Sequence, residues 1–140
     1  MTIKLDHINL TVENLKDSVE WYQKIFGFEI VESGITPKGI KWGIVGSSES
    51  MICMTVYSGR IAADKAEDRV GHQIYHFGIR VSDIVHWQQT IQNNSFKLYY
   101  GVQIDYPTSK SWYVHDPSGH EIEVSYTAYE RLQFLSGGVQ

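Results

Sequence analysis

The feature that most constrains this chain is an internal repeat. Residues 7–12 (HINLTV) align with residues 76–81 (HFGIRV), and residues 52–55 (ICMT) align with residues 122–125 (IEVS). In both copies a strand-like segment comes before a helical pattern and then three more strand-like segments. Two tandem βαβββ units are the simplest interpretation of such a repeat. The sequence therefore predicts an α+β fold made of two βαβββ modules.

The first strand and helix of each module have clear local signals. From Leu5 to Val12 the chain alternates, so that His7 and Asn9 share one face while Ile8 and Leu10 share the other. Helical spacing follows over residues 15–26, with Asn14 or Asp17 as N-cap and Gly27 as the stop. The second helix is predicted over residues 84–92, capped by Ser82 or Asp83. Further strands are predicted at 28–35, 39–45, 51–57, 74–81, 96–104, 110–115 and 121–126.

The 140 residues suit a single domain. We expect the first module at about residues 3–57, a polar linker at 58–72 with a helical turn near 62–67, and the second module at about 73–127. A tail, 128–140, would contain a short helix at 129–135. One helix would cover one face of each sheet, and the opposite faces would curve round a shared cavity for a metal ion and a substrate.

The hairpin at residues 111–125 contains an unusual carboxylate. Asp116-Pro-Ser-Gly119 fits a type I turn that closes a three-residue loop and pairs Asp116 with His120. Tyr113 then falls opposite Glu123 and Ser111 opposite Ser125, so these side chains share one face. Glu123 lies in the middle of a strand whose neighbours, Ile122 and Val124, face the other way. A bound metal ion would explain this carboxylate.

Two histidines complete a plausible ligand set. His7 and His76 occupy equivalent positions in the two repeats and, with Glu123, form a set of two histidines and one carboxylate. Such a set holds a divalent metal (Fe, Mn, Zn, Ni or Co) and leaves coordination positions open. The alternative is that all three are ordinary polar side chains on the sheet faces of a metal-free protein. Tyr113 is the candidate acid or hydrogen-bond donor, and the candidate substrate-binding residues are Asn9, Cys53, Arg80 and Ser111.

Composition narrows the functional class. The net charge of −4 and the absence of a Lys/Arg cluster argue against a nucleic-acid partner. No apolar run reaches membrane-spanning length, and the N-terminus lacks a signal-peptide pattern. The single cysteine, Cys53, excludes an internal disulfide and fits a reducing compartment. We therefore expect a cytoplasmic protein that acts on a small molecule.

Four motifs carry a resemblance to a known family. They are LDHINLTV (5–12), WY with GF at the helix end (21–28), YHFGIRV (75–81) and DPSGHEIEV (116–124). Over about residues 3–127 the chain resembles the vicinal oxygen chelate superfamily, which includes glyoxalase I, methylmalonyl-CoA epimerase, extradiol dioxygenases, fosfomycin-resistance proteins and bleomycin-resistance proteins. The resemblance implies paired βαβββ modules, metal ligands at His7, His76 and Glu123, a homodimer, and chelation of a substrate through two adjacent oxygens.

Departures from each subfamily leave the reaction open. Cys53 stands where glyoxalase I has a glutamate and the epimerases a glutamine, which disfavours glyoxalase I itself. Extradiol dioxygenases match from Tyr113 to Glu123 but carry a second-sphere histidine before the tyrosine, for which Tyr106 or His115 would have to substitute. Fosfomycin-resistance proteins match residues 111–120. Their phosphonate site, however, needs a lysine and further hydroxyls on the preceding strand, where this chain has Gln103 and Pro107, and Asn9 stands where a threonine is usual. Arg131, past the last strand, is the one residue that would partly compensate.

The sequence thus predicts a divalent-metal-dependent enzyme of dioxygenase or lyase type. Two alternatives stay open: a fosfomycin-type resistance enzyme, and a metal-free drug- or metabolite-binding protein of the bleomycin-resistance kind.

Overall fold

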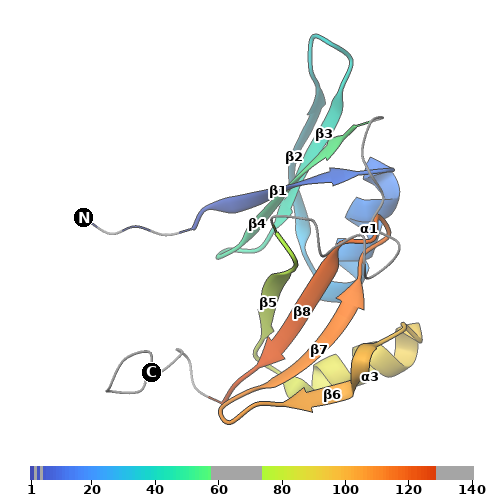
Figure 1. Ribbon diagram of the computed structural model, residues 1–140. Coiled ribbons are helices and arrows are strands. Elements are labelled where there is room, and N and C mark those ends of the chain that lie inside the picture. Colours follow the sequence, from blue (N-terminus) through green and yellow to red (C-terminus); the bar gives the residue numbers. More distant parts are fainter. Residues whose placement is uncertain (2, 4, 58–73, 129–140) are drawn as a thin grey trace. The chain divides into compact units, whose positions relative to one another are not determined.

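The computed structural model describes residues 1, 3, 5–57 and 74–128. The chain divides into two compact units, which are Met1–Gln73 with His115–His120, and Ile74–Val114 with Glu121–Gln140. Each unit holds one four-stranded sheet, and strand–helix–three strands is the order in both (Figure 1), which confirms the predicted βαβββ pair. The elements are β1 (His7–Val12), α1 (Leu15–Phe26), β2 (Glu29–Ile35), β3 (Lys41–Gly46), β4 (Met51–Val56), β5 (Phe77–Val81), α3 (Ile84–Asn94), β6 (Tyr99–Asp105), β7 (Lys110–His115) and β8 (Glu121–Tyr126).

The first sheet has the strand order β1-β4-β3-β2, with β1 parallel to β4 and the other neighbours antiparallel. Its apolar face carries the fully buried Val12, Val45 and Met54. This face packs on α1, because a Cβ added to Gly43 would lie 3.1 Å from a methyl carbon of Leu15. The predicted alternation of β1 is thereby confirmed, and its polar residues lie on the opposite face.

Helix α1 begins and ends where the sequence predicts. The Asn14 side chain accepts a hydrogen bond from the backbone N–H of Asp17, which satisfies one of the donors left free at a helix start. Gly27 ends the helix in the left-handed conformation at φ 66°, where glycine has no steric cost. The buried face of the helix carries the side chains of Val19 and Tyr22.

The hairpin loop at residues 115–120 belongs to the first unit. Asp116 and His120 pair as predicted, since the backbone N–H of Asp116 donates to the carbonyl of His120 (3.0 Å), and Gly119 donates to the carbonyl of Asp116 (3.0 Å). The buried Asp116 carboxylate accepts from the Tyr22 hydroxyl (2.9 Å) and lies 2.8 Å from Nδ1 of His120. It also accepts from the backbone N–H groups of Ser118 and His120, at 2.9 Å each. The Asp116 carboxylate therefore fixes the loop to α1, and both of its oxygens are engaged in hydrogen bonds.

The second sheet has the order β5-β8-β7-β6, with β5 parallel to β8. Trp112, Ile122 and Val124 are buried, and the Trp112 ring meets Trp87 of α3 at 6.4 Å between centroids. Trp112 is thus a core residue facing α3. Since side chains alternate along a strand, the other face of β7 and β8 carries the polar residues Ser111, Tyr113, Glu121 and Glu123.

Strand β6 departs most from expectation. It starts at Tyr99 instead of Phe96, and its pairing with β7 shifts register between Tyr99 and Ile104. Within this bulge Tyr100 has φ 63° and Gly101 has φ 111°. An aromatic residue in the left-handed region is a genuine outlier. A bulge of this kind bends a strand and redirects its side chains.

Other boundaries differ by a few residues. Strand β5 begins at Phe77 and not at Ile74, so His76 lies just before it, and α3 extends to Asn94. The predicted linker 58–72 and the predicted helix 129–135 lie outside the described residues. In the part of the chain that the structure describes, no helix is long and apolar enough to cross a membrane.

Candidate functional site

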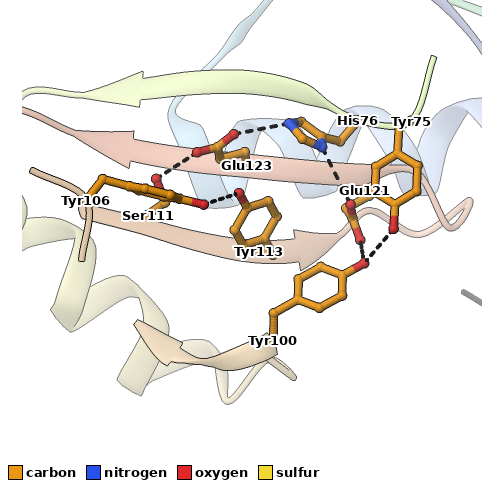
Figure 2. Close-up of polar contacts among 8 residues, drawn as sticks. All are labelled: Tyr75, His76, Tyr100, Tyr106, Ser111, Tyr113, Glu121 and Glu123. Carbon is orange, nitrogen blue, oxygen red and sulfur yellow. Dashed lines mark hydrogen bonds and ion pairs between the residues drawn. The ribbon is translucent and has the colours of Figure 1, made fainter. Parts of the chain in front are cut away.

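The second unit brings two of the predicted ligands together. His76 enters the sheet just before β5, and Glu123 lies in the middle of β8. Their nearest polar atoms, Nε2 of His76 and Oε2 of Glu123, are 3.1 Å apart (Figure 2). Their side chains are 32% and 25% exposed, so a ligand can reach both.

Ser111 supports the Glu123 carboxylate from the neighbouring strand. Its hydroxyl donates to Oε1 of Glu123 at 2.7 Å, and the serine is fully buried. The hydrogen bond confirms that residues 111 and 123 share a face, as the hairpin alternation predicts. It also leaves Oε2 of Glu123 directed at His76 (Figure 2).

Tyr113 lies beside this pair. Its ring meets the His76 ring edge to face at 5.6 Å, and its hydroxyl is 3.2 Å from that of Tyr106. Burial, the hydrogen bond with Tyr106 and the negative charge of Glu123 together raise the pKa of Tyr113 well above the ordinary tyrosine value. Tyr113 therefore keeps its proton at neutral pH, and its hydroxyl can donate a hydrogen bond or a proton but cannot serve as a base.

A second carboxylate, which the sequence analysis did not consider, lies on the other side of His76. Glu121 is 2% exposed, and its Oε2 is 3.7 Å from Nδ1 of His76. The Tyr100 hydroxyl donates to Oε1 of Glu121 at 2.6 Å, and the Tyr75 hydroxyl is 3.4 Å from that of Tyr100. The sequence does carry a signal for this residue. Glu121 lies two residues before Glu123 in the same strand, and because side chains alternate along a strand, the two carboxylates share a face. Nothing in the sequence indicates the bulge that directs Tyr100.

The polar face of the first unit carries two of the predicted substrate-binding residues. Asn9 pairs with Cys53 across β1 and β4, and the Thr55 hydroxyl donates to Oδ1 of Asn9 at 3.2 Å. Trp42 pairs with Thr55 and lies on this face too. Burial and the nearby charge of Asp6 raise the pKa of the Cys53 thiol, which disfavours its thiolate form.

His7 and Arg80 are both accessible. Nδ1 of His7, in the first unit, lies 2.7 Å from Oδ2 of Asp6. Arg80 pairs with Ser125 on β8, which places it on the Glu123 face of the second sheet, and it is exposed.

The donor chemistry of the second unit fits a divalent metal. A nitrogen and an oxygen that each lie about 2.0–2.2 Å from one cation are about 3.0–3.5 Å apart when they are adjacent ligands. The His76–Glu123 separation of 3.1 Å agrees with this spacing. Metal-binding carboxylates are themselves hydrogen-bonded, as Glu123 is by Ser111. Over residues 1, 3, 5–57 and 74–128, no group of three or more His, Cys, Asp or Glu side chains is arranged to hold a metal ion.

A cavity of about 570 Å³ lies in the first unit between α1 and the neighbouring strands β2 and β3, away from this polar face. Leu15, Val19, Ile30 and Val56 are among its lining residues. None of the residues predicted to bind metal or substrate lines this cavity.

Comparison with known proteins identifies the class. Residues 4–124 match the model of the Glyoxalase/Bleomycin resistance protein/Dioxygenase superfamily, and the chain belongs to this superfamily. The resemblance inferred from the four sequence motifs is therefore confirmed.

Particular relatives differ in activity. A trivalent organoarsenical cleaving enzyme from Bacillus sp. (strain MD1) is 27% identical over 131 residues, which cover 89% of this chain and 74% of the relative. The metallothiol transferase FosB from Staphylococcus epidermidis is 24% identical over 137 residues, covering 93% and 87%. The fosfomycin resistance protein FosX from Listeria monocytogenes, solved with Mn(II) and sulfate, has a TM-score of 0.65 at 18% identity, covering 93% and 97%, and shares the fold.

Proposed function

We propose that this protein is a divalent-metal-dependent enzyme that binds a small molecule through two adjacent oxygen atoms. The observation that carries the proposal is the pair formed by Nε2 of His76 and Oε2 of Glu123, 3.1 Å apart and partly exposed. His7 is the proposed third ligand, because it occupies in the first repeat the position that His76 occupies in the second.

The surrounding residues have separable roles. A divalent cation held by this set would act as a Lewis acid toward the substrate oxygens. Ser111 fixes the orientation of Glu123, and we assign it this supporting role in place of direct substrate binding. Tyr113, which retains its proton, donates to a substrate oxygen that gains negative charge. Asn9, Cys53 and Arg80 remain the proposed substrate contacts.

Metal affinity of purified protein tests the proposal. We expect His76→Ala, Glu123→Ala and His7→Ala each to weaken binding of Mn²⁺ or Zn²⁺ by more than about 100-fold, since loss of a supporting group alone costs 10- to 100-fold. Competition with a coloured chelator gives the affinity. His86→Ala and Glu29→Ala are matched controls, because both side chains are exposed and lie outside the site. These two variants should bind metal as the wild type does.

Two outcomes would contradict the proposal. Wild-type protein prepared without chelators that binds neither metal more tightly than the site variants would favour a metal-free drug- or metabolite-binding protein. Unchanged affinity in His7→Ala alone would remove His7 from the ligand set and leave His76 and Glu123 in it.

For the reaction, an organoarsenical cleaving relative favours the lyase side of the proposal. Trivalent arsenic prefers soft sulfur ligands, and this chain offers only Cys53, so two thiolates of one chain cannot hold the arsenic. We therefore propose a substrate bound through oxygen. Oxygen uptake with catechols by the anaerobically Fe(II)-loaded protein tests the dioxygenase version.

A fosfomycin-type transferase is the second candidate, favoured by the metallothiol transferase relative. The strand before the hairpin offers Gln103, whose amide donates to Asp105, and the nearby Lys110 is paired with the same carboxylate at 2.6 Å. Gln103 carries no charge, and Lys110 already has a carboxylate partner, so this strand offers no unpaired cation dedicated to a phosphonate. Thiol-dependent consumption of fosfomycin tests this candidate. The homodimer and the cytoplasmic location stay predictions, and light scattering would measure the former.

A further inference from the structure

Four tyrosines are grouped with His76 on the polar face of the second unit (Figure 2). The ring of Tyr113 meets the His76 imidazole edge to face at 5.6 Å between centroids, and the ring of Tyr75 meets it in the same way at 5.9 Å. The ring of Tyr100 meets that of Tyr113 at 5.2 Å, again close to perpendicular. Tyr106, which follows β6, has its hydroxyl 3.2 Å from that of Tyr113. Aromatic rings from several segments therefore adjoin one of the proposed metal ligands.

Three of these side chains form a surface that we call the tyrosine wall. Tyr75, Tyr100 and Tyr106 are 43%, 50% and 45% exposed, whereas Tyr113 is buried. Single exposed apolar side chains are ordinary on a protein surface and need no explanation. Aromatic surface that is gathered beside a few convergent polar groups is instead typical of a site for a small molecule. The tyrosine wall has this character, because it lies beside the polar side chains of the candidate site.

The hydroxyl groups of the tyrosine wall are engaged with neighbouring side chains. The Tyr100 hydroxyl donates to Oε1 of Glu121 at 2.6 Å and lies 3.4 Å from the Tyr75 hydroxyl. The Tyr106 hydroxyl is within hydrogen-bond distance of Tyr113. These contacts hold the rings in place, so little conformational freedom is lost when a ligand meets them. A ligand at the wall therefore meets mainly ring surface that is already oriented.

We propose that the substrate carries an aromatic ring next to its two chelating oxygens, and that the tyrosine wall selects this ring. The inference rests on the proposed function, since oxygens bound at His76 and Glu123 would place the ring against the wall. Aromatic rings favour edge-to-face and offset contacts, and such pairs add to the free energy gained by burial alone. An aliphatic group of the same size gains only the burial.

Two chelating probes that differ in one property test the selection. Benzohydroxamate and cyclohexanecarbohydroxamate both bind metal ions through two adjacent oxygens and carry rings with the same number of carbons, but only the first ring is aromatic. Calorimetric titration of the Mn²⁺-loaded protein gives a dissociation constant for each probe. The ratio of the two constants is compared between wild type and variants, so that the intrinsic affinity of each probe for the metal cancels.

Substitutions in the tyrosine wall should change this ratio. Tyr75→Leu and Tyr106→Leu each remove one ring and keep an apolar side chain, so each should lower the preference for benzohydroxamate about 3-fold, and the double variant about 10-fold. Tyr75→Phe and Tyr106→Phe keep the rings and should keep the preference. His86→Leu is the matched control, because it replaces an exposed ring of α3 and should leave the ratio unchanged. Urea unfolding confirms that each variant is folded.

The metal-free wild type provides a second test, which depends on neither a metal nor the folding of the Leu variants. NMR follows the ring protons of Tyr75 and Tyr106 during titration with benzyl alcohol or cyclohexylmethanol, and the signals are assigned by their loss in the Phe variants. The concentration dependence of the shifts gives the affinity of each probe. We expect benzyl alcohol to bind more tightly at both rings. Equal affinities for the two alcohols would overturn the inference.

The outcomes separate the two proposals. If the wild type binds no metal, the proposed function fails, and the NMR titration alone decides whether the wall selects an aromatic ring. If the hydroxamates bind with the same ratio in the wild type and in the folded double variant, the proposed function stands and the wall does not select the ring. Leu variants that alter the oligomeric state in light scattering, but not the ratio, would assign the wall to contact between copies of the chain.

Discussion

At the scale of single residues, the candidate site depends on hydrogen bonds between side chains of adjacent strands. Glu123 has one oxygen held by Ser111 and the other directed at His76. A carboxylate fixed in this way loses little conformational freedom when it binds a cation, which favours affinity. The serine is fully buried, so its hydroxyl serves the carboxylate and does not meet solvent.

Replacing Ser111 by alanine tests this support. We expect Ser111→Ala to lower metal affinity about 10-fold, as loss of a supporting group does, and to lower the free energy of unfolding by about 1 kcal/mol through the lost hydrogen bond. Chelator competition and urea unfolding measure the two effects. Ser82→Ala, at an exposed position, should leave both unchanged. Wild-type affinity in Ser111→Ala would show that Glu123 needs no such support.

The site could be predicted from sequence only where alternation fixes the face of a side chain. Parity along β7 and β8 correctly places Ser111 beside Glu123, and it would have placed Glu121 there as well. Tyr100 was beyond reach, because residue preferences argue against an aromatic side chain at a positive φ. His7 as a ligand remains a prediction from the repeat.

At the scale of elements, local caps determined how well boundaries could be predicted. Asn14 and Gly27 define α1 at both ends, and its predicted range agrees with the structure. Helix α3 ends at Ser95 with φ 50°, where no glycine marks the stop, and its predicted end is two residues early. For β6, the bulge makes an alternation pattern unreliable, because an extra residue shifts the faces.

The contact between α1 and the hairpin loop gives a prediction about pH. Burial, and then the charge and hydrogen bond of Asp116, raise the pKa of Tyr22 well above the ordinary value of about 10. As the pH rises through about 10, the unfolded chain releases this proton and the folded protein retains it, so stability falls. We expect Tyr22→Phe to be about 1–2 kcal/mol less stable near neutral pH and to lose stability less steeply above about pH 10.

Urea unfolding at several pH values measures both quantities. Tyr57→Phe, at an exposed tyrosine, is the matched control and should keep the wild-type slope. Parallel pH profiles for wild type and Tyr22→Phe would mean that Tyr22 does not retain its proton in the folded state.

At the scale of the whole molecule, the first unit is discontinuous in sequence. It consists of the N-terminal module and the loop His115–His120, which the chain supplies from between two strands of the second unit. The predicted division into two consecutive modules describes the order of the elements, but it does not include the assignment of the loop His115–His120 to the first unit. Hydrophobic periodicity reports which face a residue is on and carries no information about which unit a loop joins.

We therefore expect one cooperative unfolding transition. Loss of the second module would withdraw Asp116 from the buried Tyr22 hydroxyl and remove its hydrogen bond. In calorimetry the measured enthalpy should equal the van't Hoff enthalpy, as a two-state transition requires. Repeating the scan at two rates excludes a kinetic artefact. Two resolved transitions would contradict this expectation.

The length of the loop between β7 and β8 limits which sequence changes this protein can tolerate. Surface loops usually accept insertions and deletions. Here a length change of one residue would slip β8 against β7 and exchange the two faces of the strand. Glu121 and Glu123 would enter the layer that packs on Trp87, while Ile122 and Val124 would replace them on the polar face. The spacing from Asp116 to Glu123 is therefore constrained at both ends, by the contact of Asp116 with Tyr22 and by the face on which Glu123 lies. Variation during evolution should appear as substitutions in this segment and not as changes in its length.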